Sequence, residues 1–180
     1  MPTILTHPAI PLALGLGLGE QIIPRRVLAV GAVVSIIPDF DVLAFPLGVS
    51  YASAFGHRGF THSIVFACAL ALIGAIACRS SRVSAMRVFV FLLLAAVSHG
   101  VLDSFTNGGL GIAFLWPWSA ERFFAPFRVI EVSPIGVAAI FSARGAAVLT
   151  SEFVWVWLPC VCVGLALAAM RRIARRDSLR

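Results

Sequence analysis

The sequence contains no lysine, and charged residues make up only 12% of its 180 positions. Soluble globular domains carry about 25% charged residues, so this chain has too little charge to cover a surface that faces water. Hydrophobic residues account for 60% of the chain, and the mean hydropathy is +0.99. These values exclude an ordinary soluble domain. They predict an integral membrane protein with one domain over residues 1–180.

Several motifs of common enzyme classes are also missing. The sequence has no G-x-S-x-G, which argues against a serine hydrolase, and no H-E-x-x-H, which argues against an ordinary zinc protease. The amino terminus lacks the basic region of a secretory signal, so we expect it to remain in the mature protein. No cysteines form a C-x-x-C pair, and we interpret all four as small hydrophobic residues within apolar runs: Cys68, Cys78, Cys160 and Cys162.

The positive charge is distributed in a way that is typical of membrane topology. All 14 basic residues are arginines, most of them in short clusters between apolar runs, and the formal net charge is +6. A nucleic-acid-binding protein would gather its basic residues into one patch or stripe. We therefore expect a lipid bilayer, and no nucleic acid, as the partner of this surface.

The apolar runs predict an all-α membrane bundle with four or five embedded helices. The clearest span is residues 152–170, which have the length that a bilayer core requires and precede a basic tail. Runs 64–78 and 85–102 are further helix candidates, whereas 8–19 and 27–49 are short or interrupted and favour buried or half-inserted helices. The stretch 104–151 has glycine, proline and scattered charge, which predicts an interfacial cap or re-entrant segment.

The arginine clusters predict which end of the bundle faces the cytoplasm. If the helices alternate between the clusters that begin at Arg25, Arg79 and Arg171, ten arginines lie at one end and four at the other. Positive residues are enriched on the cytoplasmic side of membrane proteins. We therefore expect a multi-pass protein with a cytoplasmic carboxyl terminus.

The histidines and most aspartates are predicted to lie at the other, non-cytoplasmic end. His99 and Asp103 have the i, i+4 spacing that places both side chains on one helix face. Such a spacing alone is often a plain hydrogen-bonded pair, but in an apolar helix an ionisable pair is a functional-site hypothesis. The candidate metal ligands at this end are His7, Asp39, Asp41, His57, His62, His99 and Asp103.

Two aspartates follow Pro38, at a point where the helix is expected to break. We favour Asp39 as a metal ligand, with Asp41 orienting a histidine or capping the next segment. The alternative is that both carboxylates cap the start of a helix.

The "HRGFTHS" stretch is expected to form a corner between a loop and a helix. Gly59 allows the turn, His57 would come from the loop, and His62 from the first turn of a helix capped by Thr61. Hydrogen bonding at the membrane interface is the alternative for both histidines. His7 carries the weakest signal, because a single histidine before a proline is often incidental.

Mixed histidine and carboxylate ligands without cysteine suit Zn²⁺, Mn²⁺ or Fe²⁺. Six or seven ligands with one bridging carboxylate favour two ions, which we expect to be Zn²⁺ and to activate a water for attack on phosphorus. Asp39 and Arg58 are the candidate catalytic residues. Arg58 could clamp a phosphate through bidentate bonds, or it could instead anchor the chain among lipid headgroups.

Three motifs in order carry a family resemblance: "PDFD", "HRGFTHS" and "HGVLDSFTNGG", followed by "LWPW". From about His7 to Trp118 the chain resembles the YdjM-like family of bacterial inner-membrane proteins, which are described as membrane-bound metal-dependent hydrolases. The resemblance implies a site in the bacterial inner membrane, which by the topology above would face the periplasm.

The order of the ligands is also similar to that of bacterial zinc-dependent phospholipase C and the related zinc nucleases, which are all-helical. That resemblance implies a phospholipase C-like helical core, with Asp103 as the bridging carboxylate. The soluble enzymes take further ligands from beyond the H-x-x-x-D motif, but no histidine follows His99 here. A third ion would need His62 or Asp41 as a substitute; otherwise the site holds two. The residues that match the ligands of these soluble enzymes are His7, Asp39, His57, His99 and Asp103.

The resulting hypothesis is a membrane-bound metal-dependent hydrolase that cleaves a phosphoester in a lipid or lipid-linked substrate. The alternatives are a metal-ion transporter and a metal-binding protein without catalysis. A transporter would place its ligands near the bilayer midplane, whereas the ligands here are predicted at the helix ends of one face.

Overall fold

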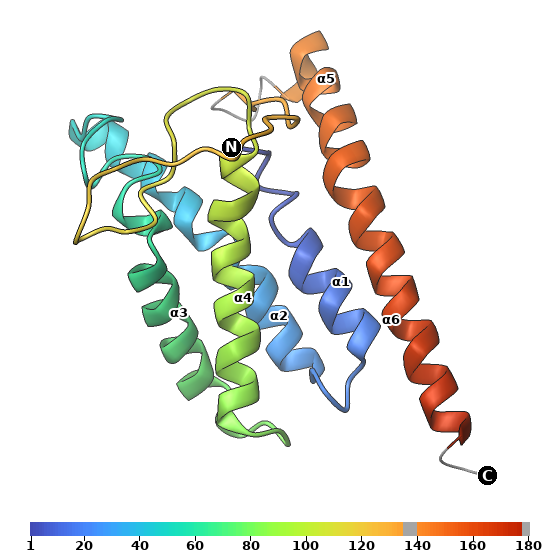
Figure 1. The fold of residues 1–180 in the computed structure, drawn as a ribbon. Helices are drawn as coiled ribbons and strands as arrows, with labels where there is room; N and C mark the ends of the chain where they lie inside the picture. The colour runs from blue at the N-terminus through green and yellow to red at the C-terminus, as the bar shows by residue number, and fades with distance from the viewer. Residues whose placement is uncertain (135–139, 178–180) are drawn as a thin grey trace.

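The computed structural model describes residues 1–134 and 140–177. It is 61% helical and has no strands in the described part, which confirms the predicted all-α class. The α-helices (Figure 1) are α1 (Ala9–Leu18), α2 (Arg25–Val34), α3 (Ile64–Ala77), α4 (Ala85–Ser104), α5 (Ala143–Glu152) and α6 (Leu158–Asp177). Two 3₁₀ segments, η1 (Ile37–Leu47) and η2 (Phe60–His62), lie between α2 and α3. A π-helical turn, η4 (Phe153–Trp157), joins α5 to α6.

Three helical stretches are long and apolar enough to cross a membrane: Arg25–Leu47, Ala85–Ser104 and Ala143–Asp177. The expectation of four or five was too high, and the stretch 27–49, which was expected to be buried or half-inserted, lies largely within the first of these three. At a rise of about 1.5 Å per residue, α1 with 10 residues and α3 with 14 are shorter than a bilayer core of about 30 Å. The carboxyl-terminal helix is in turn longer than the predicted 152–170, because it begins at Ala143.

The helices pack around α4, which lies between α3 and the pair α1 and α2 (Figure 1). The closest partnerships are those of α3 with α4 and of α1 with α6. The close packing of α1 against α6 depends on Gly17, since a Cβ atom there would lie 2.8 Å from the Cβ of Leu167. A buried apolar cluster that includes Val27, Ala71 and Leu92 joins α2, α3 and α4.

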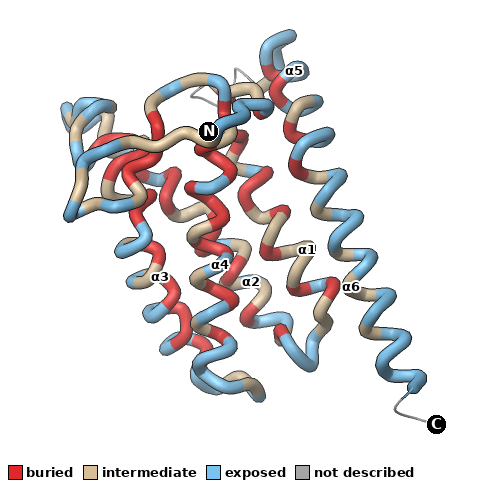
Figure 2. The backbone as a smooth tube through the Cα atoms, viewed as in Figure 1, coloured by how far each residue is buried: buried red, intermediate tan, exposed pale blue. Residues whose placement is uncertain are grey.

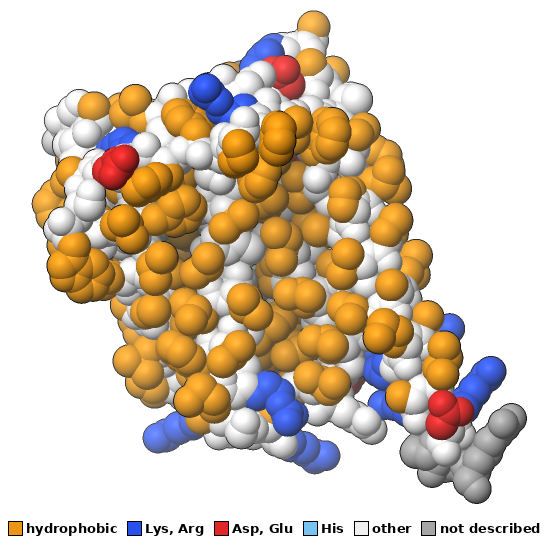
Figure 3. Space-filling view, in the orientation of Figure 1, with side chains coloured by type: hydrophobic (Ala, Val, Ile, Leu, Met, Phe, Trp, Pro, Cys, Tyr) orange, Lys and Arg blue, Asp and Glu red, His pale blue; other side chains and the backbone are white. Residues whose placement is uncertain are grey.

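The outer surface of the bundle is largely apolar, as Figure 3 shows for one face. Only 6% of the most apolar window in the carboxyl-terminal helix is buried, and Figure 2 shows α6 exposed along its length. Arginine side chains gather at the end where α1 joins α2, α3 joins α4, and α6 ends (Figure 3). The three arginine groups of the sequence therefore share one end, although Arg180 lies outside the described residues.

The opposite end carries η1, η2 and a non-helical stretch that follows α4 (Figure 1). Residues 105–134 contain isolated bridges between Thr106 and Ile130 and between Ile112 and Phe123. The predicted cap region, 104–151, thus begins as irregular chain but ends in helix α5, while residues 135–139 lie outside the described part. This irregular stretch covers the end of α4 where His99 and Asp103 lie.

Candidate metal centre

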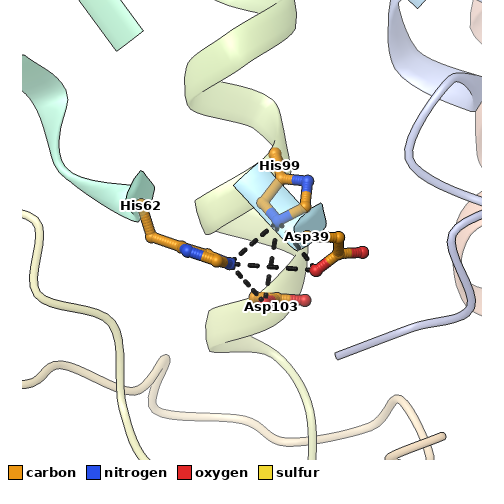
Figure 4. Close-up of side chains that lie close together, drawn as sticks. All are labelled: Asp39, His62, His99 and Asp103. Atoms are coloured by element: carbon orange, nitrogen blue, oxygen red, sulfur yellow. Dashed lines mark hydrogen bonds and ion pairs between the residues drawn. The ribbon is translucent and has the colours of Figure 1, made fainter. Parts of the chain in front are cut away.

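Five of the candidate ligands come together from separate elements, although they are far apart in the sequence. Helix α4 presents two of them one turn apart, η1 and η2 each add one, and the last precedes α1. All five are at most 5% exposed, so they form a polar cluster enclosed in an apolar protein. The five residues are His7, Asp39, His62, His99 and Asp103. Figure 4 draws all of them except His7.

One half of this cluster brings together single ligand atoms of four residues within 4.8 Å of one another (Figure 4). The Nε2 atoms of His62 and His99 are 3.0 Å apart. Asp103 Oδ2 is 3.3 Å from His62 Nε2, and Asp39 Oδ1 is 3.4 Å from His99 Nε2. Ligands at 2.0–2.1 Å around a tetrahedral zinc ion are about 3.3 Å apart, so these separations suit one ion.

The other half is formed by His7 and the remaining oxygens of the same two carboxylates. His7 Nε2 is 3.4 Å from Asp39 Oδ2 and 3.8 Å from Asp103 Oδ1. Asp39 and Asp103 thus each turn one oxygen toward His62 and His99 and the other toward His7. Two carboxylates shared in this way are suited to bridging two cations.

The two histidines of the first half are held with Nε2 directed into the cluster. His99 Nδ1 is 2.8 Å from the carbonyl oxygen of Ser35, to which it donates, so its neutral ring carries the lone pair on Nε2. His62 Nδ1 is 3.0 Å from Thr61 Oγ1 and 3.3 Å from Asp41 Oδ2. Hydrogen bonds from the second ring nitrogen orient metal-binding histidines in the same way.

Several buried atoms of the cluster have no hydrogen-bond partner among the described residues. They are both ring nitrogens of His7 and both carboxylate oxygens of Asp39 and of Asp103. Most buried polar atoms in proteins are paired, because an unpaired one costs free energy. A cation between these atoms would satisfy them, so the residues present fit a divalent metal.

The electrostatics of the cluster also favour positive charge. Burial, the largest single effect, lowers the pKa of His62, but the nearby carboxylates of Asp103 and Asp41 outweigh it and raise that pKa to about 9. The carboxylates therefore stabilise a cation at this point of the protein interior.

Asp41 and His57 lie beside the cluster and interact chiefly with each other. His57 Nδ1 is 2.6 Å from Asp41 Oδ1. The other oxygen of Asp41 accepts from Thr61 Oγ1 at 2.7 Å and from the Arg58 backbone N–H at 3.3 Å. Together with His62 these two residues form a second group that could hold an ion. Unlike Asp39 and Asp103, however, Asp41 already accepts hydrogen bonds on both oxygens.

Arg58 lies on the far side of Asp103 and is fully buried. Its Nη1 donates to the carbonyl oxygens of Gly108 and Leu110, at 3.0 and 2.6 Å, and its Nη2 donates to Thr106 Oγ1 at 2.8 Å. Its Nε is 3.5 Å from Asp103 Oδ2. The structure thus places this guanidinium between a carboxylate of the cluster and the loop after α4, while its role as a phosphate clamp stays a prediction.

The N-cap of α3 differs from the prediction by two residues, although the helix begins where the run 64–78 placed it. Ser63 caps the helix by accepting a hydrogen bond from the Phe66 backbone N–H, whereas Thr61 was expected to do so. The reason is the extra 3₁₀ turn η2, which holds Thr61 and His62 before the helix begins. This turn leaves the Thr61 hydroxyl free of the helix and directed to Asp41.

Sequence reasoning missed Glu152, a buried carboxylate at the end of α5 that is 1% exposed. It accepts hydrogen bonds from the Thr3 backbone N–H, from Thr3 Oγ1 at 2.7 Å and from Thr6 Oγ1 at 2.6 Å. Trp157 Nε1 donates to the same Thr6 hydroxyl at 3.1 Å. The carboxyl-terminal helix therefore fixes the segment before His7. The available signal was a lone glutamate at the head of an apolar run.

The fold and this cluster define a helical membrane protein whose interior can hold a divalent cation at one end of the bundle. Comparison with known proteins agrees on the class: residues 1–175 match the family of the YdjM inner membrane protein. The chain belongs to this family.

Two relatives show how far the similarity extends. Inner membrane protein YbcI of Escherichia coli (strain K12) is 49% identical over 160 residues, which cover 88% of this chain and 92% of that protein. Uncharacterized protein YvsG of Bacillus subtilis (strain 168) is 31% identical over 98 residues, 51% of this chain and 58% of its own. No solved structure matches. An inner-membrane protein family is thus established.

Proposed function

We propose that this protein is a metal-dependent hydrolase of the inner membrane that cleaves a phosphoester in a lipid or lipid-linked substrate. The observation that carries the proposal is the pair of shared carboxylates, Asp39 and Asp103, each with one oxygen toward His7 and the other toward His62 and His99. Their burial without hydrogen-bond partners supports a resident cation pair. The likeness to zinc-dependent phospholipase C enters as an analogy for the chemistry.

In this proposal the protein side chains hold two Zn²⁺ ions, with Mn²⁺ or Fe²⁺ as alternatives. His62 and His99 would hold one ion and His7 the other, with Asp39 and Asp103 contributing an oxygen to each. Two such ions would supply an activated water and stabilise the charge that develops during displacement at phosphorus. Asp39 would be catalytic in the sense that it helps to hold the ions at the reacting centre.

The surrounding residues have positioning roles in this proposal. Asp41 holds the rings of His57 and His62 through their Nδ1 atoms. In this proposal Asp41 and His57 therefore do not bind a metal ion themselves. Arg58 fixes Asp103 through its charge and anchors the loop after α4. Two ions, without a third, therefore suit the geometry best.

A lipid substrate is supported by the surroundings of the cluster. A small opening of about 10 Å³, the space of roughly one water, lies beside His62. Its remaining walls are mainly apolar and come from α3, α4 and residues near them, including Ile64, Ala96 and Phe114. Figure 3 shows a hollow among apolar side chains below the irregular end of the bundle. The opening itself has room for one water and not for a substrate, so the proposal of a lipid substrate rests on the apolar surface around it.

The activity is tested by assaying the purified protein against phosphodiesters and phospholipids, with and without a chelator. We expect turnover that a chelator abolishes and that Zn²⁺ or Mn²⁺ restores. A protein that binds metal but hydrolyses none of these substrates would overturn the hydrolase proposal. Metal uptake into sealed vesicles would then identify the transporter alternative.

The orientation in the membrane is a second part of the proposal. Because the arginine groups share one end, we propose a cytoplasmic carboxyl terminus and a metal centre that faces the periplasm. Reporter fusions after Ser84, at the arginine end of α4, and after Ser104, at the other end, test it. We expect a cytoplasmic reporter to be active at Ser84 only. Activity at Ser104 instead would reverse the orientation.

The Glu152 anchor predicts a selective loss at one half of the centre. In Glu152→Ala the Thr3 and Thr6 donors lose their acceptor, so the segment that carries His7 is released. We expect the metal content to fall from about two ions per chain toward one, because His62 and His99 are held by other contacts.

The matched control is Glu131→Ala, which removes a partly exposed carboxylate paired with Arg144. That change should leave the metal content as it is. Metal analysis of both variants checks the prediction, and two tightly held ions in Glu152→Ala would contradict it.

A further inference from the structure

A second polar cavity lies at the opposite end of the bundle from the metal centre. It measures about 500 Å³ and is enclosed by the end of α1, the turn into α2, the start of α2 and the last turns of α6. Three arginines and one glutamate line it: Arg25, Arg171, Arg175 and Glu20. The cavity therefore carries an excess of positive charge where the apolar surface of the bundle ends (Figure 3).

The arginines of α6 are held in place by contacts with the turn after α1. Arg171 Nη1 donates to the Leu16 carbonyl oxygen at 3.3 Å, and Arg175 Nη2 donates to Gln21 Oε1 at 2.7 Å. Gly19 makes room for the first, since it has a φ of 83° and a Cβ atom there would lie 1.7 Å from Arg171 Nη1. A guanidinium has five N–H donors, so a bond to one carbonyl is compatible with a further ligand.

Two apolar grooves adjoin this cavity along the bundle. One, of about 310 Å³, follows the contact of α1 with α6 and shares Leu16 with the cavity. The other, of about 460 Å³, is lined by Leu18, Ile22 and Met170 and shares Arg171 and Arg175 with it. A basic cavity that shares lining residues with two apolar grooves suits a diacyl lipid with an anionic headgroup.

We propose that this cavity binds the phosphate headgroup of an anionic phospholipid, whose acyl chains lie in the two adjoining grooves. Arg171 and Arg175 have the i, i+4 spacing that puts them on one face of α6, and guanidinium groups bind phosphate oxygens in bidentate fashion. Basic pockets between membrane helices bind anionic headgroups in this manner. The site is independent of the metal centre and of the proposed hydrolase activity.

The test compares two double variants with the same loss of charge on the same helix. Arg171→Ala/Arg175→Ala removes the two arginines that line the cavity, whereas Arg172→Ala/Arg176→Ala removes two that do not. Native mass spectrometry of the detergent-purified chain measures binding of phosphatidylglycerol against phosphatidylethanolamine. We expect the unchanged protein to prefer phosphatidylglycerol, and the cavity variant to bind it about 10- to 30-fold more weakly.

The control variant is expected to stay within about twofold of the unchanged protein. Equal losses in both double variants would show general attraction between arginines and anionic lipid, and would overturn the proposal. So would equal binding of the two lipids by the unchanged protein. Displacement of phosphatidylglycerol by millimolar inorganic phosphate would assign the cavity to free phosphate instead.

A third variant, Gly19→Ala, tests the cavity without removing any charge. The added Cβ atom must displace the Arg171 guanidinium. We expect phosphatidylglycerol binding to weaken with the net charge unchanged. Unaltered binding in a folded Gly19→Ala protein, together with unaltered binding in the cavity double variant, would exclude the site.

Discussion

Replacing Asp103 with asparagine is expected to remove both metal ions from the purified protein. Asp103 is fully buried and turns Oδ2 toward His62 and Oδ1 toward His7, so one substitution takes a ligand from both halves of the centre. Asparagine keeps the shape of the side chain but removes the negative charge that both proposed ions would share. Metal analysis should show a fall from about two ions per chain to fewer than one, with loss of any hydrolysis.

The informative comparison for this variant is Asp41→Asn. Asp41 accepts hydrogen bonds from His57 and Thr61 and lies close to His62, so its loss disturbs the orientation of ligands rather than their number. Partners of this kind change metal affinity by about 10- to 100-fold. We therefore expect Asp41→Asn to bind two ions more weakly. Two ions held with unchanged affinity in Asp103→Asn would show that this carboxylate is not a ligand.

Replacing Arg58 with methionine is expected to cause the largest loss of stability. The change leaves Asp103 Oδ2 without its nearest guanidinium, and it also removes the donors to Thr106 and to the Gly108 and Leu110 carbonyls. Removing one partner of a buried ion pair costs about 3–5 kcal/mol, because the other charge stays buried. Thermal unfolding in detergent should show a correspondingly lower midpoint.

Arg144→Met provides the matched control for this prediction. Arg144 also pairs with a carboxylate, Glu131 at 2.7 Å, but the Arg144 side chain is exposed and that of Glu131 is partly exposed. Exposed pairs contribute about 0–1 kcal/mol, so the midpoint should hardly move. Equal midpoints for the two variants would mean that the buried contacts of Arg58 do not stabilise the fold.

The fold was predictable from the sequence as far as hydropathy and local spacing reach. The lack of charge indicated a membrane protein, and the apolar runs indicated helices. Hydropathy alone did not separate short embedded helices from true spans: the run 64–78 forms a helix of only 14 residues, whereas the interrupted run 27–49 lies in a stretch long enough to span. The N-cap of α3 was misassigned because a 3₁₀ turn precedes the helix, and Thr61 and Ser63 are both residue types that suit a cap.

The membership of the metal centre was partly predictable for a related reason. Charge topology and the i, i+4 spacing of His99 and Asp103 placed histidines and aspartates at one end of the bundle. Sequence reasoning favoured Asp39 over Asp41 as a metal ligand but left the role of Asp41 open, because both lie in an irregular segment, where spacing does not define direction. It also had no means to pair Glu152 with Thr3, since 149 residues separate them.

By itself the sequence determined that the protein is helical, lies in a membrane and gathers its ionisable residues at the ends of its apolar segments. Those properties follow from composition and from contacts within single helices. The tertiary structure decided that Asp39 as well as Asp103 turns one oxygen toward each half of the cluster, that Asp41 contacts both His57 and His62, and that Arg58 and Glu152 are buried. These outcomes depend on how η1, the amino-terminal segment and the carboxyl-terminal helix pack against α4, and packing between distant segments leaves no periodic pattern in a single sequence.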